Sequence, residues 1–202
     1  MTLDRLRPLA DRALVPFVAA AERLGLTPNS VSVVSLLLAG GASGAFYVAG
    51  RDPMWYLAGA LLVFLNGWLD LIDGALAREL SLASEAGDLL DHVIDRYADL
   101  VMIAGLAAGV GRYALGLAAV TGVLMTSYLG TQAQAVGLDR VYGGLLGRAD
   151  RLALMGVTTA VAAFVTASVA TLSLVGWLLV VFALVGHLTA LQRFYYAYRD
   201  LT

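Results

Sequence analysis

The decisive stretch of this sequence reads Asp70-Leu-Ile-Asp73-Gly74-Ala-Leu-Ala77-Arg78 and, after eight further residues, Gly87-Asp88-Leu-Leu-Asp91-His92-Val-Ile-Asp95. Six of the chain's 12 aspartates lie between positions 70 and 99. Most of them lie at the ends of apolar runs that are long enough to cross a bilayer. Ionised carboxylates are costly beside lipid, so they usually persist where they pair, line a wet cavity or hold a cation. The stretch therefore predicts membrane helices that carry a functional site.

The spacing of the aspartates predicts where their side chains point. Helical neighbours lie three and four residues apart, so Asp70, Asp73 and Ala77 share one helix face, and Asp91 and Asp95 share a face of the next helix. Two helices joined by a short connector are expected to be antiparallel neighbours, which lets the two pairs meet. Four like charges so close would repel one another. A divalent cation removes this repulsion, and oxygen ligands suit Mg²⁺ or Mn²⁺.

Small residues accompany the aspartates at fixed offsets. Gly74, Ala77 and Gly87 leave room for a ligand to approach the backbone, and Arg78 is suited to clamp a phosphate. A single aspartate pair at a helix end is often only a solvated cap. The complete set of four aspartates with these neighbours indicates a metal and phosphate site instead.

The pattern Asp-x2-Asp-Gly-x2-Ala-Arg-x8-Gly-x3-Asp-x3-Asp resembles the signature of the CDP-alcohol phosphotransferases, integral-membrane enzymes that make phospholipid head groups. Every fixed position is matched, and Thr27-Pro28-Asn29 and Gln192-Arg193 are weaker similarities. The resemblance implies that Asp70, Asp73 and Asp91 bind divalent metal, as two Mg²⁺ or Mn²⁺ ions, and that Asp95 is both metal ligand and catalytic base. It also implies a homodimer. The residues expected to bind the CDP-lipid are Asn29, Gly74, Ala77, Arg78, Ser84 and Gly87.

The composition indicates a polytopic membrane protein. Of 202 residues, 60% are hydrophobic and 14% charged, and the mean hydropathy is +0.80. All 13 basic residues are arginine, there is no cysteine, and no basic stripe points to nucleic acid. Residues 1–26 have apolar residues at helical spacing among charges, which favours an amphipathic helix in the membrane interface. We expect an all-α integral membrane protein in which this helix precedes a six-helix transmembrane domain, residues 27–202.

Apolar runs of bilayer length predict the six spans, near residues 30–50, 54–77, 87–110, 112–136, 150–170 and 172–194. Gly40, Gly41 and Gly44 in the first span favour close helix packing. With both termini in the cytoplasm, ten arginines fall on the inner side, only Arg51 and Arg112 fall outside, and Arg96 lies within a span. This bias predicts a cytoplasmic membrane protein whose aspartates face the cytoplasm. The ten inner arginines are residues 5, 7, 12, 23, 78, 140, 148, 151, 193 and 199.

The reaction implied by the resemblance is attack of an acceptor hydroxyl on the lipid-side phosphorus of CDP-diacylglycerol or CDP-archaeol, with release of CMP. A polyol phosphate, either inositol phosphate or glycerol 3-phosphate, is the favoured acceptor, and serine or free inositol is the alternative. Family members that use a phosphorylated acceptor tend to carry basic residues at the inner end of the fourth span, where this chain has a neutral segment, 127–134. Arg148, Arg151 and Arg193 are the candidate anion pocket in their place.

Two other classes of protein place carboxylates in membrane helices. An intramembrane prenyltransferase also holds a diphosphate with aspartates and Mg²⁺, but it does not require Gly74, Arg78 and Gly87 at these offsets. A divalent-cation transporter should carry its carboxylates near mid-bilayer or along a path, whereas here they cluster at one end. CMP release measured against cation flux in liposomes separates the three classes.

Overall fold

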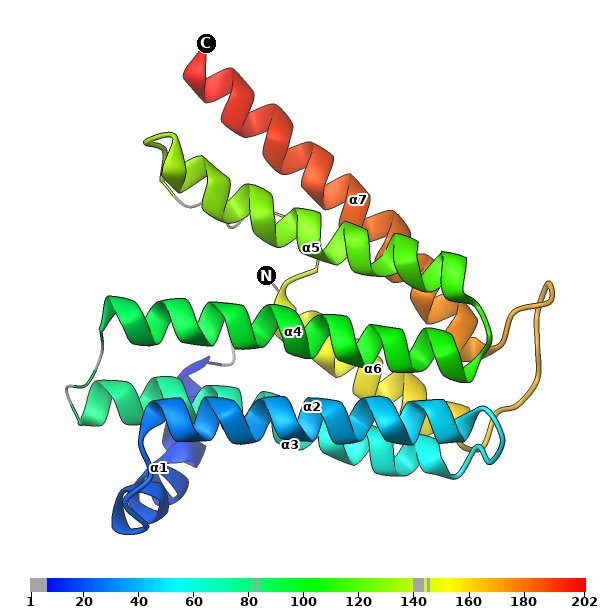
Figure 1. The fold of residues 1–202 in the computed structure, drawn as a ribbon, viewed down its shortest axis with the longest axis horizontal. Coiled ribbons are helices and arrows are strands. Elements are labelled where there is room, and N and C mark those ends of the chain that lie inside the picture. Colours follow the sequence, from blue (N-terminus) through cyan, green and yellow to red (C-terminus); the bar gives the residue numbers. More distant parts are fainter. Residues whose placement is uncertain (1–6, 81, 83, 140–143, 145) are drawn as a thin grey trace.

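The computed structural model describes residues 7–80, 82, 84–139, 144 and 146–202, with side chains from Ala13 onwards. The described chain is helical, apart from one isolated β-bridge (Figure 1). Arg5 and Arg140, which count toward the predicted orientation, lie outside the described residues. The seven helices of this part are α1 (Arg7–Arg23), α2 (Pro28–Ala49), α3 (Trp55–Glu79), α4 (Glu85–Gly109), α5 (Tyr113–Ala135), α6 (Arg148–Ala162) and α7 (Leu174–Leu201).

Four of the described helices are long and apolar enough to cross a membrane, namely α2, α3, α5 and α7. Their most apolar windows have mean hydropathies between 1.4 and 2.2. Helix α4 has 25 residues, but six of them are charged. Helix α6 has only 15 residues, or about 22 Å at 1.5 Å per residue. The structure thus supports a multi-pass membrane protein without establishing six spans.

The predicted fifth span is shorter than expected, because α6 ends at Ala162 and not near residue 170. An irregular segment follows, in which Val169 and Leu172 form the isolated bridge. Ala170 and Thr171 between them have positive φ angles, which a helix cannot accommodate. Arg112 Nη2 donates a hydrogen bond of 3.0 Å to the Thr171 carbonyl and holds this turn against the start of α5.

Side-chain caps fix the beginnings of α2 and α4, at the end of the bundle that carries the aspartates. Thr27 is the N-cap of α2, and its hydroxyl accepts a hydrogen bond from the Ser30 backbone N–H. Ser84 is the N-cap of α4, and its hydroxyl accepts a bond of 3.1 Å from the Gly87 N–H. Each cap satisfies a backbone donor that the first helical turn leaves unpaired.

Helix α2 lies at the centre of the part that carries the aspartates, since both α3 and α4 pack along it (Figure 1). The close approach depends on glycines of α4: a Cβ atom at Gly105 or Gly109 would meet the backbone of Ser43 or Phe46 in α2. The prediction for Gly40 and Gly44 is wrong within this chain, because a Cβ atom there would meet nothing. Both are exposed, whereas Gly41 does lie near α3, because a Cβ atom there would be 3.4 Å from Leu62 Cδ1.

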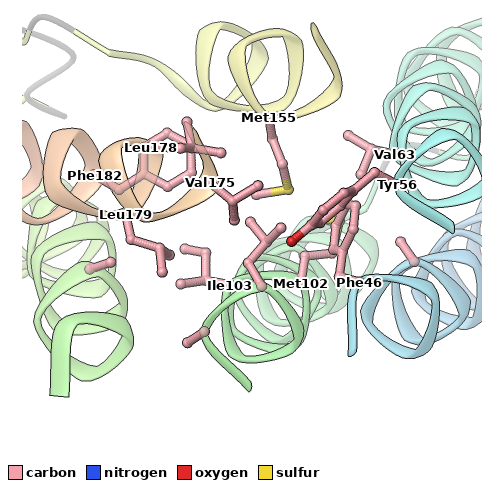
Figure 2. Close-up of a cluster of buried hydrophobic side chains, with 14 of the residues drawn as sticks. Phe46, Tyr56, Val63, Met102, Ile103, Met155, Val175, Leu178, Leu179 and Phe182 are labelled. Carbon is pink, nitrogen blue, oxygen red and sulfur yellow. The ribbon is translucent and has the colours of Figure 1, made fainter. Parts of the chain in front are cut away.

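The main core joins α2, α3 and α4 to α6 and α7. Met155 of α6 points into the middle of this core, towards Tyr56 and Phe46 on one side and Val175 on the other (Figure 2). Helix α5 is packed chiefly on α7, and both project beyond the rest of the bundle (Figure 1). The core therefore fixes α6, and with it Arg148 at its first position, relative to α3 and α4.

A second, smaller core holds α1 against the aspartate-bearing end of α3. Leu14, Val18 and Ala21 are buried at helical spacing and pack with Ile72 and Leu76. A helix is thus present in the predicted N-terminal segment, and its position in the membrane interface stays a prediction.

Candidate active site

Three carboxylates converge between α3 and α4. Asp70 comes from α3, Asp91 and Asp95 come from α4, and one oxygen of each lies within 4.8 Å of the others. The helices do not pack directly on each other as expected, because their main contacts are with α2. The three carboxylate side chains meet in the space that this leaves between α3 and α4. Oxygen atoms so close together fit a hard divalent cation, which accepts carboxylate ligands from separate helices.

The fourth predicted ligand, Asp73, lies next to this group but is held from another direction. Its side chain is 6% exposed, and its Oδ2 accepts a hydrogen bond of 2.8 Å from Ser32 Oγ of α2. Asp73 is not one of the three carboxylates that meet within 4.8 Å. It lies beside Asp91 on the wall of a neighbouring cavity.

Arg148 bridges two of the three converging carboxylates. Its Nη1 lies 2.7 Å from Asp70 Oδ1 and its Nη2 lies 2.9 Å from Asp95 Oδ1. Its Nε is 3.8 Å from Asp99 Oδ1. The two prongs of the guanidinium thus join α3 to α4 from the first residue of α6, a contact that the sequence did not predict.

Asp99 anchors the arginines one helical turn beyond Asp95. It is 2% exposed, and its Oδ2 accepts a hydrogen bond of 2.7 Å from Arg151 Nη2. Arg96 Nη2 lies 3.8 Å from the same oxygen and 3.7 Å from Asp95 Oδ2. Since a buried carboxylate needs such partners to remain charged, Asp99 and the arginines form one unit.

A cavity of about 160 Å³ opens beside the carboxylates, between the beginnings of α2 and α4 and the end of α3. Its walls include five of the six residues predicted to bind the CDP-lipid, which are Asn29, Gly74, Ala77, Ser84 and Gly87. Asp73 and Asp91 complete its polar wall. The structure thus brings these distant positions together.

Arg78, the sixth predicted CDP-lipid residue, is not on the wall of that cavity. Its side chain is exposed and lines a second cavity of about 380 Å³ between α1 and α3, with Leu14, Val18 and Glu22. It still runs back along α3, because a Cβ atom at Gly74 would lie 3.5 Å from Arg78 Nη1.

The remaining predicted acceptor residue, Arg193 of α7, is 8% exposed, and its Nη1 donates a hydrogen bond of 2.7 Å to the Thr126 carbonyl of α5. Thr126 and Arg151 both line a cavity of about 10 Å³ with Thr189. The Thr189 hydroxyl is buried and has no hydrogen-bond partner among the described residues. Thr126 thus links Arg193 to the cavity that Arg151 lines, while Arg148 lies with the carboxylates.

Sequence reasoning missed Ser32 as the partner of Asp73. Forty-one residues separate the two, and no helical spacing relates them. The only signal was a serine one turn into the helix that follows Thr27-Pro28-Asn29. A second polar pair, Ser35 with the buried Asn66, joins α2 to α3 one turn farther along.

A bundle of membrane-length helices with a carboxylate cluster at one end, beside arginines and a polar cavity, defines an integral-membrane enzyme for a phosphorylated substrate. The family model for CDP-alcohol phosphatidyltransferase matches residues 25–186. The chain therefore belongs to the CDP-alcohol phosphatidyltransferase family. It is a CDP-alcohol phosphotransferase of phospholipid biosynthesis and a multi-pass membrane protein, and its carboxylate cluster could hold a divalent metal ion.

Similar proteins include the archaetidylinositol phosphate synthase of Methanothermobacter thermautotrophicus, which is 29% identical over 98% of this chain and 95% of its own length. The archaetidylinositol phosphate synthase of Pyrococcus horikoshii is 30% identical over 78% of this chain and 81% of its own. In structure, the chain resembles Mycobacterium tuberculosis phosphatidylinositol phosphate synthase with CDP-DAG bound (TM-score 0.78, 24% identity, 93% and 94% of the two chains covered). The same mycobacterial protein has been solved with manganese and citrate (TM-score 0.78, 24% identity, 92% and 88% covered).

Proposed function

We propose that the chain transfers the lipid phosphoryl group of CDP-archaeol or CDP-diacylglycerol to a hydroxyl of an inositol phosphate, and releases CMP. The observation that carries the acceptor is the link that Thr126 makes between two buried arginines: Arg193 donates to its carbonyl, and Thr126 and Arg151 line one small cavity. The acceptor's phosphate would bind between these two guanidinium groups. Likeness to archaetidylinositol phosphate synthases over nearly the whole chain supports the same acceptor. Glycerol 3-phosphate is the second choice, since it offers the same phosphate.

Asp70, Asp91 and Asp95 are the proposed metal ligands, with Asp73 beside them, for two Mg²⁺ or Mn²⁺ ions. When bound, the ions neutralise the diphosphate and polarise the leaving phosphate. The carboxylates suit this task because they come from two helices held on α2, so the donor oxygens are already close before a ligand arrives.

Asp95 is the proposed catalytic base. Its carboxylate takes the proton of the acceptor hydroxyl as the new oxygen–phosphorus bond forms. The phosphorus–oxygen bond of the anhydride breaks, and its electron pair leaves on CMP. Asp95 lies on the side of the carboxylate group that faces the arginines, through Arg148 at 2.9 Å and Arg96 at 3.7 Å. An acceptor phosphate near these arginines would hold its hydroxyl within reach of this base.

The donor head group would occupy the cavity lined by Asn29, Gly74, Ala77, Ser84 and Gly87. Small residues at three of these positions let a nucleotide approach the helix backbone. Arg78 would reach the diphosphate from the neighbouring cavity, whose apolar wall of Leu14 and Val18 can take lipid. The tails would then stay in the bilayer while the head group enters the protein.

The proposed topology has six spans, with α4 and α6 added to the four candidate helices. Both termini and the carboxylates face the cytoplasm, as the arginine distribution predicts. Residues 1–26 form the interfacial segment and residues 27–202 the catalytic domain, which agrees with the family match from residue 25. A homodimer is the proposed assembly.

The test is CMP release by the purified protein from a CDP-lipid with Mg²⁺, with inositol 3-phosphate, glycerol 3-phosphate, free inositol and serine as acceptors. Inositol 3-phosphate should give the highest kcat/KM. In folded protein, Arg151→Gln should raise the KM for inositol 3-phosphate and leave the KM for the CDP-lipid nearly unchanged, because a guanidinium on the acceptor side is lost. The variant also takes the closest partner from Asp99, so its melting temperature is measured alongside.

Arg199→Gln is the matched control, since it removes the same charge from an exposed arginine near the end of α7. It should leave both KM values unchanged. The enzyme could instead prefer serine or free inositol, with an acceptor KM that Arg151→Gln does not change. That result would contradict a phosphorylated acceptor and leave the family chemistry intact.

A further inference from the structure

Arg148 was expected in the acceptor pocket, yet its guanidinium lies on the metal-ligand side. Its two terminal nitrogens contact Asp70 at 2.7 Å and Asp95 at 2.9 Å, one carboxylate from each helix. Both are close ion pairs, although none of the three guanidinium nitrogens is aligned with a hydrogen-bond partner among the described residues. Two of the three carboxylates that converge within 4.8 Å are therefore engaged by a cation that belongs to the protein.

A guanidinium in this place opposes a divalent ion in two ways. Its terminal nitrogens stand against one oxygen each of Asp70 and Asp95, which the ion needs as ligands. It also places a positive charge a few ångströms from the ion, and the side chain is only 14% exposed, so water screens the repulsion poorly. Occupation of the carboxylates by a metal ion therefore favours a different position of the Arg148 guanidinium.

The acceptor side offers that other position. Arg148 Nε is already 3.8 Å from Asp99, which also binds Arg151 at 2.7 Å. A small rotation of the side chain about this end would carry its two prongs away from Asp70 and Asp95 and leave it beside Arg151. Arginine's planar fork matches a phosphate there, in place of the two carboxylates that it releases.

We propose that Arg148 couples the metal site to the acceptor site. It pairs with Asp70 and Asp95 before the divalent cation binds, yields both carboxylates to the cation, and then binds the acceptor's phosphate. The coupling rests on the proposed function in that it takes the acceptor to be phosphorylated. Since binding free energies are linked, the cation and the acceptor phosphate must strengthen each other's binding by the same factor.

The first experiment measures Mn²⁺ binding to the purified, EDTA-treated protein by electron paramagnetic resonance of the free ion. Arg148→Gln should bind Mn²⁺ at least about tenfold more tightly than the wild type, because a competing charge is gone. Arg148→Lys, which keeps the charge, should stay near the wild-type affinity. Arg199→Gln is the control: it removes the same charge from an exposed arginine that pairs with Asp200, and should leave the affinity unchanged.

The second experiment repeats the wild-type titration with saturating inositol 3-phosphate. The Kd for Mn²⁺ should fall at least about fivefold, within the usual range of such couplings. Arg148→Gln should lose this effect. The wild-type measurement needs no substitution, so it decides the coupling even where Arg148→Gln does not fold.

The outcomes separate the two proposals. If folded Arg148→Gln binds Mn²⁺ only as tightly as the wild type, or more weakly, then Arg148 does not compete with the cation for the carboxylates. A second outcome is that this variant binds Mn²⁺ more tightly, while inositol 3-phosphate has no effect on Mn²⁺ binding by the wild type. Arg148 then competes with the cation, but it does not couple cation binding to that acceptor. In that case the acceptor panel shows whether the proposed function has failed as well.

Discussion

Ser32 Oγ donates a hydrogen bond of 2.8 Å to Asp73 Oδ2, and this bond ties the central helix α2 to the aspartate-bearing end of α3. The Ser32 hydroxyl is also 3.2 Å from the Pro28 carbonyl, one turn back along α2. Both Ser32 and Asp73 are buried. The position of one predicted metal ligand is therefore set by a side chain of another helix, outside the aspartate pattern.

Ser32→Ala should lower activity by about 10- to 100-fold, the usual cost of losing a group that orients a metal ligand. It should also cost about 1 to 3 kcal/mol of stability, since Asp73 loses a buried donor. Ser35→Ala is the control. In this variant the Asn66 side chain keeps its hydrogen bond of 2.8 Å to the backbone carbonyl of residue 35, and Asn66 lies one helical turn from the carboxylates. Equal loss of activity in both variants, measured as CMP release, would contradict an orienting role for Ser32.

Asp95→Asn should reduce kcat by at least about a hundredfold, since the proposed base and a metal ligand are both lost. Glu85→Gln removes one negative charge from the exposed first turn of the same helix and should retain wild-type rates. Single-turnover CMP release at saturating Mg²⁺ distinguishes the two. Substantial turnover by Asp95→Asn would exclude this residue as the base.

Gly109→Ala should destabilise the bundle by about 1 to 3 kcal/mol, the range for an overpacked core. The added methyl group would clash with the backbone of Phe46 and push α4 away from α2. Gly40→Ala adds the same group where nothing lies within 4 Å and should be tolerated. Thermal melting followed by tryptophan fluorescence compares them, and equal melting temperatures would show that α2 and α4 are not so close.

The absence of native cysteines permits a clean test of topology. In single-cysteine variants, Arg7→Cys, Ser84→Cys and Asp200→Cys should react with an impermeant maleimide only from the cytoplasmic side. Asp52→Cys, in the connection between α2 and α3, should react only from outside. Labelling of Ser84→Cys from outside would reverse the proposed orientation of the carboxylates.

Much of the site follows from local spacing. The meeting of Asp70 with Asp91 and Asp95 could be predicted, because residues three and four apart share a helix face and a short connector returns the chain. The same reasoning placed Gly74, Ala77 and Gly87 together. Their distances from the carboxylates depend on α2, however, and nothing in the spacing revealed that α3 and α4 are held apart by a third helix.

Contacts between distant segments could not be predicted. Arg148 follows Asp70 by 78 residues, and an arginine near the inner side of a membrane is as compatible with an acceptor phosphate as with a carboxylate. The early end of α6 was missed for a related reason. Residues 163–170 are apolar enough to continue a span, and the turn at Ala170 and Thr171 depends on contacts with Arg112 and Trp177.

The burial of Asp99 constrains how acceptor preference can change. A neutral residue at position 151, as an enzyme for an uncharged alcohol would need, leaves the Asp99 carboxylate without its closest partner at 2% exposure. Breaking such a buried pair from one side typically costs about 3 to 5 kcal/mol. Redesign towards free inositol or serine should therefore begin with both positions at once, for example Asp99→Leu with Arg151→Met. Natural drift between acceptors would face the same requirement for two coordinated changes.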